Sequence, residues 1–271
     1  MASDIDTVWA RDAEQAAGPQ PLSREAIVAA AIEIADTEGL EAVSIRKIAT
    51  KLETRPMSLY SHIERKGDLI DLMVDEVMGG AVLPEPLPGD WREAIREIAQ
   101  RTRESTRAHP WMIAAAFRRP FIGPNALRHF DQSLGAVASL PLPPERKRAV
   151  LLAVDTYTLG FVRWEVISKA RHGDHEGPDA SCAAVPTDGP SAAEIDAYVA
   201  AQAASGKYPH LAELGGKKKM SLGVKAEAFE AGLDWLLAGI EAEVGDSGAA
   251  GSGRLSRAAV SPILRNGRPT S

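Results

Sequence analysis

The segment from Ser44 to Lys66 carries the side chains whose types and spacing best define a chemical task. It holds six Lys or Arg residues and only two Glu, whereas the whole chain has a net charge of −6. A short, strongly basic element on an acidic protein creates a local positive field, and such a field attracts polyanions. Neutralisation of phosphates by Lys and Arg supplies most non-specific affinity for nucleic acid, so the segment indicates a phosphate-binding surface.

The spacing within this segment is typical of a helix-turn-helix. Apolar residues at Ile45, Ile48 and Leu52 predict one short helix capped by Ser44, and Pro56 can open a second one. A three-residue turn, Glu53 to Arg55, separates them. The polar and aromatic side chains of the second helix can reach base edges or phosphate oxygens. We expect the DNA contacts to be Ser44, Arg46, Lys47, Arg55, Pro56, Met57, Ser58, Tyr60, Ser61, His62 and Lys66.

The rest of the chain reads as helices, with no sustained strand alternation, so the sequence predicts an all-α protein of about nine or ten helices. We expect an N-terminal three-helix helix-turn-helix domain at 22–67 and a larger helical bundle domain at 68–244. Polar, Gly-rich or Arg-rich composition predicts disordered tails at 1–21 and 245–271, the second of them basic. Further helices are expected at 23–39, from 68, and at 90–109, 110–121, 124–140, 144–171, 191–205 and 222–244.

Composition narrows the protein class further. The chain has 271 residues, 45% hydrophobic and 25% charged, which suits a globular protein. Cys182 is its one cysteine, so an intrachain disulfide and a four-cysteine zinc site are excluded. His172, His175 and Glu176 lie near it in a Gly/Pro-containing stretch, where a solvated loop is favoured over a metal site. We predict no metal and no cofactor. The N-terminus lacks a signal-peptide pattern and the apolar runs are short, which predicts a cytoplasmic protein without a membrane partner.

Three stretches together resemble the tetracycline-repressor-like (TetR) family of transcriptional regulators: Gly39 to Ala49, Leu59 to Ile63 and Lys66 to Ile70. Looser similarity follows in 157–165, 205–211 and 229–233. The resemblance implies a homodimer with an N-terminal DNA-binding domain and a C-terminal domain for a small inducer. It also implies phosphate contacts by Tyr60, His62 and Lys66. Two positions depart from the family pattern, because Glu53 replaces the usual turn glycine and Arg55 the usual small cap residue.

The large side chains of the second domain are candidates for an inducer pocket between helices, although each of them is also a plausible core residue. The candidates are His109, Trp111, Met112, Phe117, Phe130, Leu134, Tyr157, Phe161 and Trp164. Because they are mostly apolar, we expect a largely hydrophobic, partly aromatic small molecule rather than a sugar or nucleotide.

These patterns predict a ligand-responsive DNA-binding regulator, acting as a repressor that a small hydrophobic molecule releases from its double-stranded DNA operator. No enzymatic constellation is evident. The alternative is a helical small-molecule binding protein or enzyme with a vestigial DNA-binding motif. Helices 149–167 and 224–244 have more apolar surface than one face can bury, so we expect them to form a homodimer interface. Phe229, Leu233, Leu236 and Leu237 are interface or core candidates, and Gly232 and Gly239 allow close helix approach.

Overall fold

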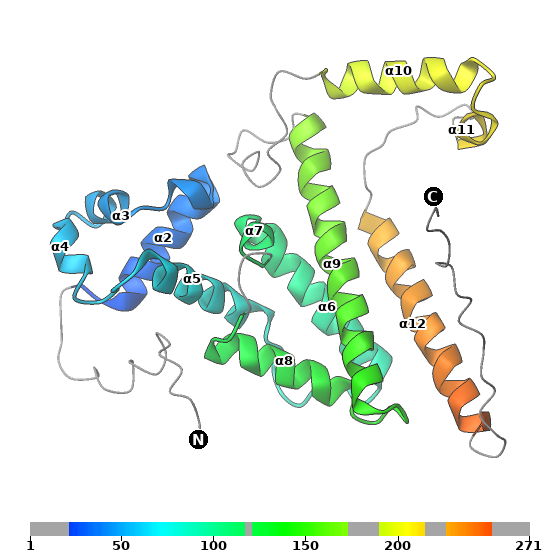
Figure 1. The fold of residues 1–271 in the computed structure, drawn as a ribbon, viewed down its shortest axis with the longest axis horizontal. Helices are drawn as coiled ribbons and strands as arrows, with labels where there is room; N and C mark the ends of the chain where they lie inside the picture. The colour runs from blue at the N-terminus through cyan, green and yellow to red at the C-terminus, as the bar shows by residue number, and fades with distance from the viewer. Residues whose placement is uncertain (1–21, 117–120, 173–189, 215–225, 251–271) are drawn as a thin grey trace, which may run out of the picture.

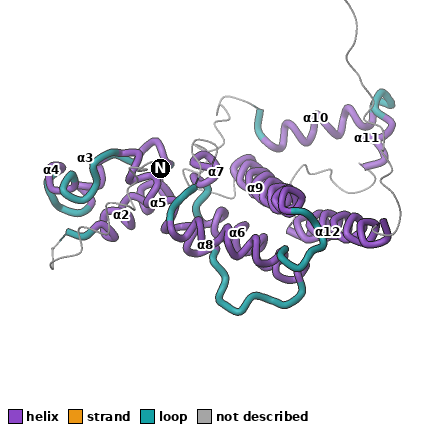
Figure 2. Tube along the Cα trace, turned by 60° about the horizontal axis from the view of Figure 1, so that its bottom comes forward, coloured by secondary structure: helices purple, strands orange, loops and turns teal. Residues whose placement is uncertain are grey.

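The computed structural model describes residues 22–116, 121–172, 190–214 and 226–250, and every regular element in these ranges is a helix (Figures 1 and 2). The all-α prediction is confirmed. The N-terminal tail expected at 1–21, the loop with His175, Glu176 and Cys182, and most of the C-terminal tail lie outside the described residues. None of the helices in the described ranges is long and apolar enough to cross a bilayer.

The N-terminal unit consists of α2 (Arg24–Glu38), the 3-10 turn η1 (Leu40–Ala42), α3 (Ile45–Lys51), α4 (Pro56–Leu59) and α5 (Lys66–Ala81). Its helix ends follow local chemistry. The Ser23 hydroxyl accepts from the Ala26 amide, and the Ser44 hydroxyl accepts from the Lys47 amide at 3.3 Å. Gly39 ends α2 with φ at 86°, a conformation that costs glycine little. These predicted boundaries are confirmed.

The second unit comprises α6 (Trp91–Ala108), α7 (Trp111–Ala116), α8 (Pro124–Ala136), α9 (Pro144–His172), α10 (Ala192–Ala204), α11 (Pro209–Leu214) and α12 (Ala226–Ala250). In Figure 1, α9 and α12 run side by side at the edge of the molecule away from α3 and α4. Two expectations are corrected. Residues 245–250, expected in the C-terminal tail, continue α12, and α11 is a helix that the sequence does not predict.

Two large clusters of buried apolar residues form the hydrophobic cores of the two units. The first joins α2, α3, α4 and α5, and it also contains Trp111, Met112 and Ala115 of α7. The second joins α6, the end of α8, the first half of α9 and α12. Because α5 supplies Leu69, Met73 and other residues to the first cluster, it packs on both sides of the boundary expected at residue 67. The short helix α7 therefore fastens the second unit to the core of the first.

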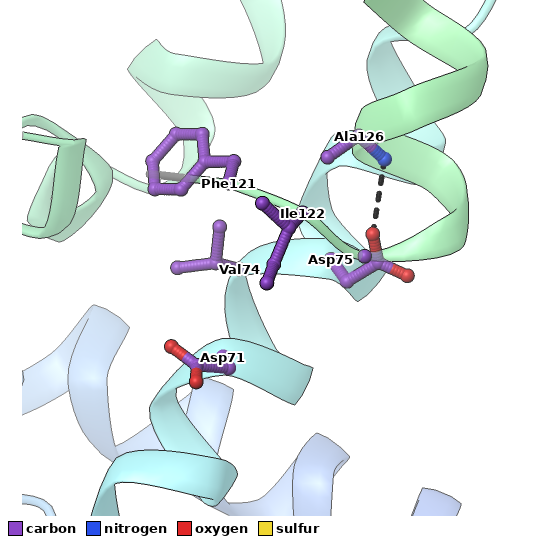
Figure 3. A pocket seen from close by; sticks show the side chains of 7 residues that line it. Asp71, Val74, Asp75, Phe121, Ile122 and Ala126 are labelled. Carbon is purple, nitrogen blue, oxygen red and sulfur yellow. Dashed lines mark hydrogen bonds between the residues drawn. The ribbon is translucent and has the colours of Figure 1, made fainter. Parts of the chain in front are cut away.

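A second fastening joins α5 to α8. The buried Asp75 carboxylate accepts hydrogen bonds from the amides of Asn125 and Ala126, at 3.3 and 3.0 Å, and so caps the start of α8. Figure 3 shows the bond to Ala126. A side chain at Gly123 would overlap that carboxylate, which explains the glycine. Buried Gln132 adds a two-point bond, accepting from the Leu83 amide at 3.0 Å and donating to the Leu83 carbonyl at 2.8 Å. The Asp75 bonds therefore join α5 to the start of α8, and the Gln132 bonds join α8 to the chain that follows α5.

Candidate nucleic-acid interface and interior polar layer

The short helices α3 and α4 are held by their apolar sides. Ile48, Leu59 and Ile63 are 0–1% exposed and belong to the first core cluster. Anchoring these residues turns the opposite side of α4 outward, where Met57 is 75% and Tyr60 is 49% exposed. Large side chains left in solvent on a firmly anchored helix are suited to contact another molecule. Arg55, Pro56, Ser58 and Ser61 are exposed beside them.

The bases around α3 and α4 fall into two groups. Lys47 and Lys51 form ion pairs with Glu38 and Glu33 of α2, so their charge is partly compensated within the chain. By contrast, Arg46, Arg55 and Lys66 are exposed and form no ion pair with any residue that the structure describes.

The free positive charge is therefore concentrated at the start of α3 (Arg46), just before α4 (Arg55) and at the start of α5 (Lys66). Lys47 must exchange its Glu38 partner for a phosphate to act as predicted.

The turn between α3 and α4 keeps a left-handed residue despite its sequence. Glu53 has φ at 52°, the one non-glycine residue with positive φ in the described ranges. A hydrogen bond from the Thr54 amide to the Ala49 carbonyl, at 2.9 Å, closes the turn. Arg55 is extended, with ψ at 142°, as a residue before proline prefers, and it supplies no side-chain cap to α4. Glu53, which replaces the turn glycine usual in the family, therefore holds a left-handed conformation that glycine would adopt at lower cost.

Local hydrogen bonds set the remaining candidate side chains. The Ser61 hydroxyl donates to the Ser58 carbonyl at 2.7 Å, and the Ser44 hydroxyl serves as a helix cap. The guanidinium of Arg24 donates to the His62 carbonyl from two nitrogens, at 3.2 and 3.3 Å. This contact ties the end of the α4 segment to α2, and it was not foreseen because the two residues are 38 positions apart. His62 itself is only partly exposed.

The predicted inducer-contact residues are spread over several places. Trp111 is 1% exposed inside the first core cluster, together with Met112. The indole nitrogen of Trp111 donates to the Asp36 carboxylate at 2.7 Å, and Nδ1 of His109 lies 2.8 Å from the same oxygen. His109 also lines an open depression of about 480 Å³ between α2, α5 and α6. These side chains thus join the two units.

Two more candidates pack against α12. The rings of Tyr157 and Phe161 lie 5.5 and 5.3 Å from that of Phe229, centroid to centroid. The Tyr157 hydroxyl donates to the Phe229 carbonyl at 2.8 Å, and burial raises the pKa of this phenol. The guanidinium of Arg103 lies over the Phe229 ring at 4.5 Å and pairs with the buried Glu165.

The other candidates lie elsewhere again. Leu134 packs on the second cluster, Phe130 and Trp164 are about half exposed, and Phe117 lies outside the described residues. The eight predicted side chains that the structure describes are therefore not gathered in one cavity.

Sequence reasoning missed a set of buried polar atoms. Thr102 Oγ1 on α6, His129 Nδ1 on α8 and Thr158 Oγ1 on α9 are buried without a hydrogen-bond partner. Asp155, one turn before Thr158, has its pKa raised to about 6 by burial. We call these four residues the polar layer. A signal for it exists in the sequence, since Thr158 interrupts the apolar stripe of Val154 and Val162 on α9.

The described residues form helices as their only regular elements, with a basic, outward-facing helix-turn-helix on one unit and an interior polar layer in the other, which is the organisation of a DNA-binding regulator. The family model "Tetracyclin repressor-like, C-terminal domain" matches residues 83–244. The chain is 31% identical over 245 residues to the HTH-type transcriptional repressor DrrR1 of Streptomyces coeruleorubidus, covering 89% of this chain and 86% of that protein. The chain belongs to the tetracycline-repressor-like family of transcriptional regulators.

Two further relatives extend the comparison. An HTH-type transcriptional regulator of Saccharopolyspora erythraea is 35% identical over 170 residues, which are 63% of this chain and 71% of that one. Among solved structures, the TetR family protein ActR of Streptomyces coelicolor in complex with actinorhodin superposes with a TM-score of 0.65. It is 26% identical, and the match covers 83% of this chain and all of that one.

Proposed function

We propose that this regulator is a repressor that binds its operator as a homodimer through α3 and α4, and that a small molecule bound among α6, α8 and α9 releases it. The carrying observation is the outward side of α4, with Met57 and Tyr60 exposed between bases that have no partner among the described residues. The names of the relatives, which are repressors and regulators, support this assignment. Such a protein acts in the cytoplasm, where the DNA is, and needs no covalent chemistry.

Roles within the DNA interface follow from position. Tyr60, His62 and Lys66 are proposed to contact the phosphate backbone, and Met57, Ser58 and Ser61 to face base edges in the major groove. Ser44, Arg46, Lys47, Arg55 and Pro56 complete the surface. Phosphate contacts contribute to affinity for every sequence, whereas base contacts decide which sequence is preferred.

The experiment starts from duplexes that the protein itself selects from a random library, followed by anisotropy titrations at several salt concentrations. Replacing both Tyr60 and Lys66 by alanine should weaken binding to all duplexes. The loss of one lysine per protomer should reduce the salt slope of a dimer by about 2. Ser58→Ala should instead change which duplexes are preferred.

The matched control replaces Lys207 and Tyr208, an exposed lysine and tyrosine before α11, by alanine. If this control weakens DNA binding as much as the Tyr60 and Lys66 change, α4 is not the DNA-binding surface.

The proposed homodimer uses the outer faces of α9 and α12. Phe229, Leu233 and Leu237 are 0% exposed and belong to the core of their own chain. The opposite side of α12 is apolar all the same, with Trp235 77% exposed among small residues. These are Ala228, Ala231, Ala238, Gly239 and Ala242. Leu152 and Trp164 add exposed apolar surface on α9. Apolar faces on two neighbouring helices suit an isologous four-helix interface.

Sedimentation tests this interface. Trp235→Glu should convert the dimer to a folded monomer at micromolar concentration, because a carboxylate would be buried at the centre of the proposed contact. Leu127→Glu is the control, since Leu127 is a comparably exposed apolar residue on α8. A Trp235→Glu protein that remains dimeric would exclude this face.

A further inference from the structure

The polar layer lies where the apolar packing of the second unit is interrupted. On α9, Val154 belongs to the large cluster shared with α6, α8 and α12, whereas Val162 packs in a small separate cluster with Ile113 of α7. Thr158 is one helical turn from each of them and is 1% exposed. Its hydroxyl is therefore fully enclosed between two apolar regions, yet it has no hydrogen-bond partner.

The helices that pack against α9 present the same kind of atom. Thr102 on α6 and His129 on α8 each bury a side-chain atom without a partner, and His129 is only 8% exposed. Helices α6, α8 and α9 all pack on one another. Most buried polar atoms in proteins are hydrogen-bonded. Three unpartnered atoms on three mutually packed helices therefore indicate that a bound molecule supplies the missing hydrogen bonds.

The chemistry of these atoms restricts that molecule. Burial lowers the pKa of His129, so its imidazole is neutral at pH 7. One ring nitrogen bonds the backbone at Ala81, and a ring nitrogen that bonds a carbonyl carries the proton. The unpartnered Nδ1 then has a lone pair and accepts hydrogen bonds.

Asp155 is a second acceptor on the same side of α9 as Thr158, since residues three apart are neighbours on a helix. Burial raises the pKa of this carboxyl to about 6, so it is mainly ionised at pH 7. It makes no hydrogen bond or ion pair with any residue in the described ranges. Hydrogen-bond donors or a positive charge would stabilise it, and a second carboxylate would be repelled.

We propose that the regulatory small molecule is held in the polar layer through its own hydrogen-bond donors, and is therefore an apolar compound with hydroxyl or amine groups and no carboxylate. This inference rests on the proposed function and names the chemical class of the ligand. It adds a polar requirement to the hydrophobic character expected from the sequence. The hydroxyls of Thr102 and Thr158 can either donate or accept a hydrogen bond, so they can pair with donor or acceptor groups of the ligand.

Three naphthalenes of matched shape test the class by calorimetry on the full chain: 2,6-dihydroxynaphthalene, 2,6-dimethoxynaphthalene and naphthalene-2,6-dicarboxylate. The dihydroxy compound should bind at least about tenfold more tightly than the dimethoxy compound, because only it donates to the polar layer. The dicarboxylate should bind more weakly than either. Equal binding of all three, tightest binding of the dicarboxylate, or no binding of the dihydroxy compound up to its solubility limit would overturn the proposal.

A substitution separates a ligand contact from a structural one. Thr158→Val keeps the shape and removes the unpartnered hydroxyl. It should raise the melting temperature of the unliganded protein by about 2–4 °C and weaken the dihydroxy compound about tenfold. Thr156→Val is the control, because Thr156 is exposed on the other side of α9. A Thr158→Val protein that is destabilised, or that binds the compound as tightly as the unchanged protein, would contradict this role.

The same compounds separate this proposal from the proposed function. If the dihydroxy compound binds as expected but leaves affinity for the selected duplexes unchanged, ligand-driven release is wrong and the ligand class stands. If a compound without donors releases the DNA and binds without regard to Thr158, the release mechanism stands and the ligand class is wrong.

Discussion

The contact between Asp36 and the α6–α7 corner should control how firmly the N-terminal unit is attached to the second unit. Asp36 lies near the end of α2, and one of its oxygens meets both Trp111 Nε1 and His109 Nδ1. Replacing Asp36 by alanine leaves the buried indole N–H of Trp111 without an acceptor. An unsatisfied buried donor costs about 1–3 kcal/mol. One kcal/mol shifts the melting temperature of a protein of this size by about 2–4 °C, so Asp36→Ala should lower it by roughly 2–12 °C.

Asp36→Asn keeps an oxygen that can accept from Trp111, and it should recover much of this loss. Glu33→Ala is the matched control on the same helix, because Glu33 pairs with Lys51 at a side-chain exposure of 63% and such pairs contribute less than about 1 kcal/mol. Differential scanning calorimetry measures all three variants. If the Asp36→Ala protein has the same melting temperature as the Glu33→Ala protein, the Asp36 contact contributes no more than an exposed ion pair and does not fasten the two units.

Three further changes probe strain, buried charge and protonation. Glu53→Gly should raise stability in urea by up to about 1 kcal/mol, because glycine accepts the positive φ, whereas Glu53→Ala should give no gain. Arg103→Met should cost about 1.5–3 kcal/mol, because buried Glu165 then keeps only its longer contact with Arg107 at 3.8 Å, and adding Glu165→Met should restore most of it; additive losses in that cycle would refute the pairing. Burial raises the pKa of Asp155 from 3.8 to about 6 in the folded protein. The ionised carboxylate therefore destabilises the folded state, and this destabilisation grows as the pH rises from 3.8 and reaches its full size above about pH 6. The melting-temperature advantage of Asp155→Asn should therefore be largest near pH 7 and fade towards pH 4; an advantage independent of pH would contradict this.

The asymmetry of α12 explains why the proposed dimer surface could not be located from the sequence alone. The sequence shows a helix that is apolar on nearly every side, and periodicity alone does not tell which side meets its own chain. In the structure, an added Cβ at Gly232 would collide with the Tyr157 side chain, so this glycine admits α9 of the same protomer. Gly239 has open space around it and lies on the outer face with Trp235. The sequence predicts close helix approach at both glycines, whereas in the structure only Gly232 admits a neighbouring helix of its own chain and Gly239 lies on the exposed face.

The sequence by itself determined most of the helices and the helix-turn-helix, because these depend on neighbours within a turn or two. Ser23, Ser44 and Pro56 favour the start of a helix whatever the tertiary fold. Apolar residues at helical spacing then decide which side of α3 and α4 is buried. Only the tertiary structure decided where the large side chains of the second unit pack. Trp111 enters the core of the first unit and Phe161 meets α12, while Thr158 faces an interior without a partner. Such placements depend on contacts between residues more than 60 positions apart, and composition and period carry no information about them.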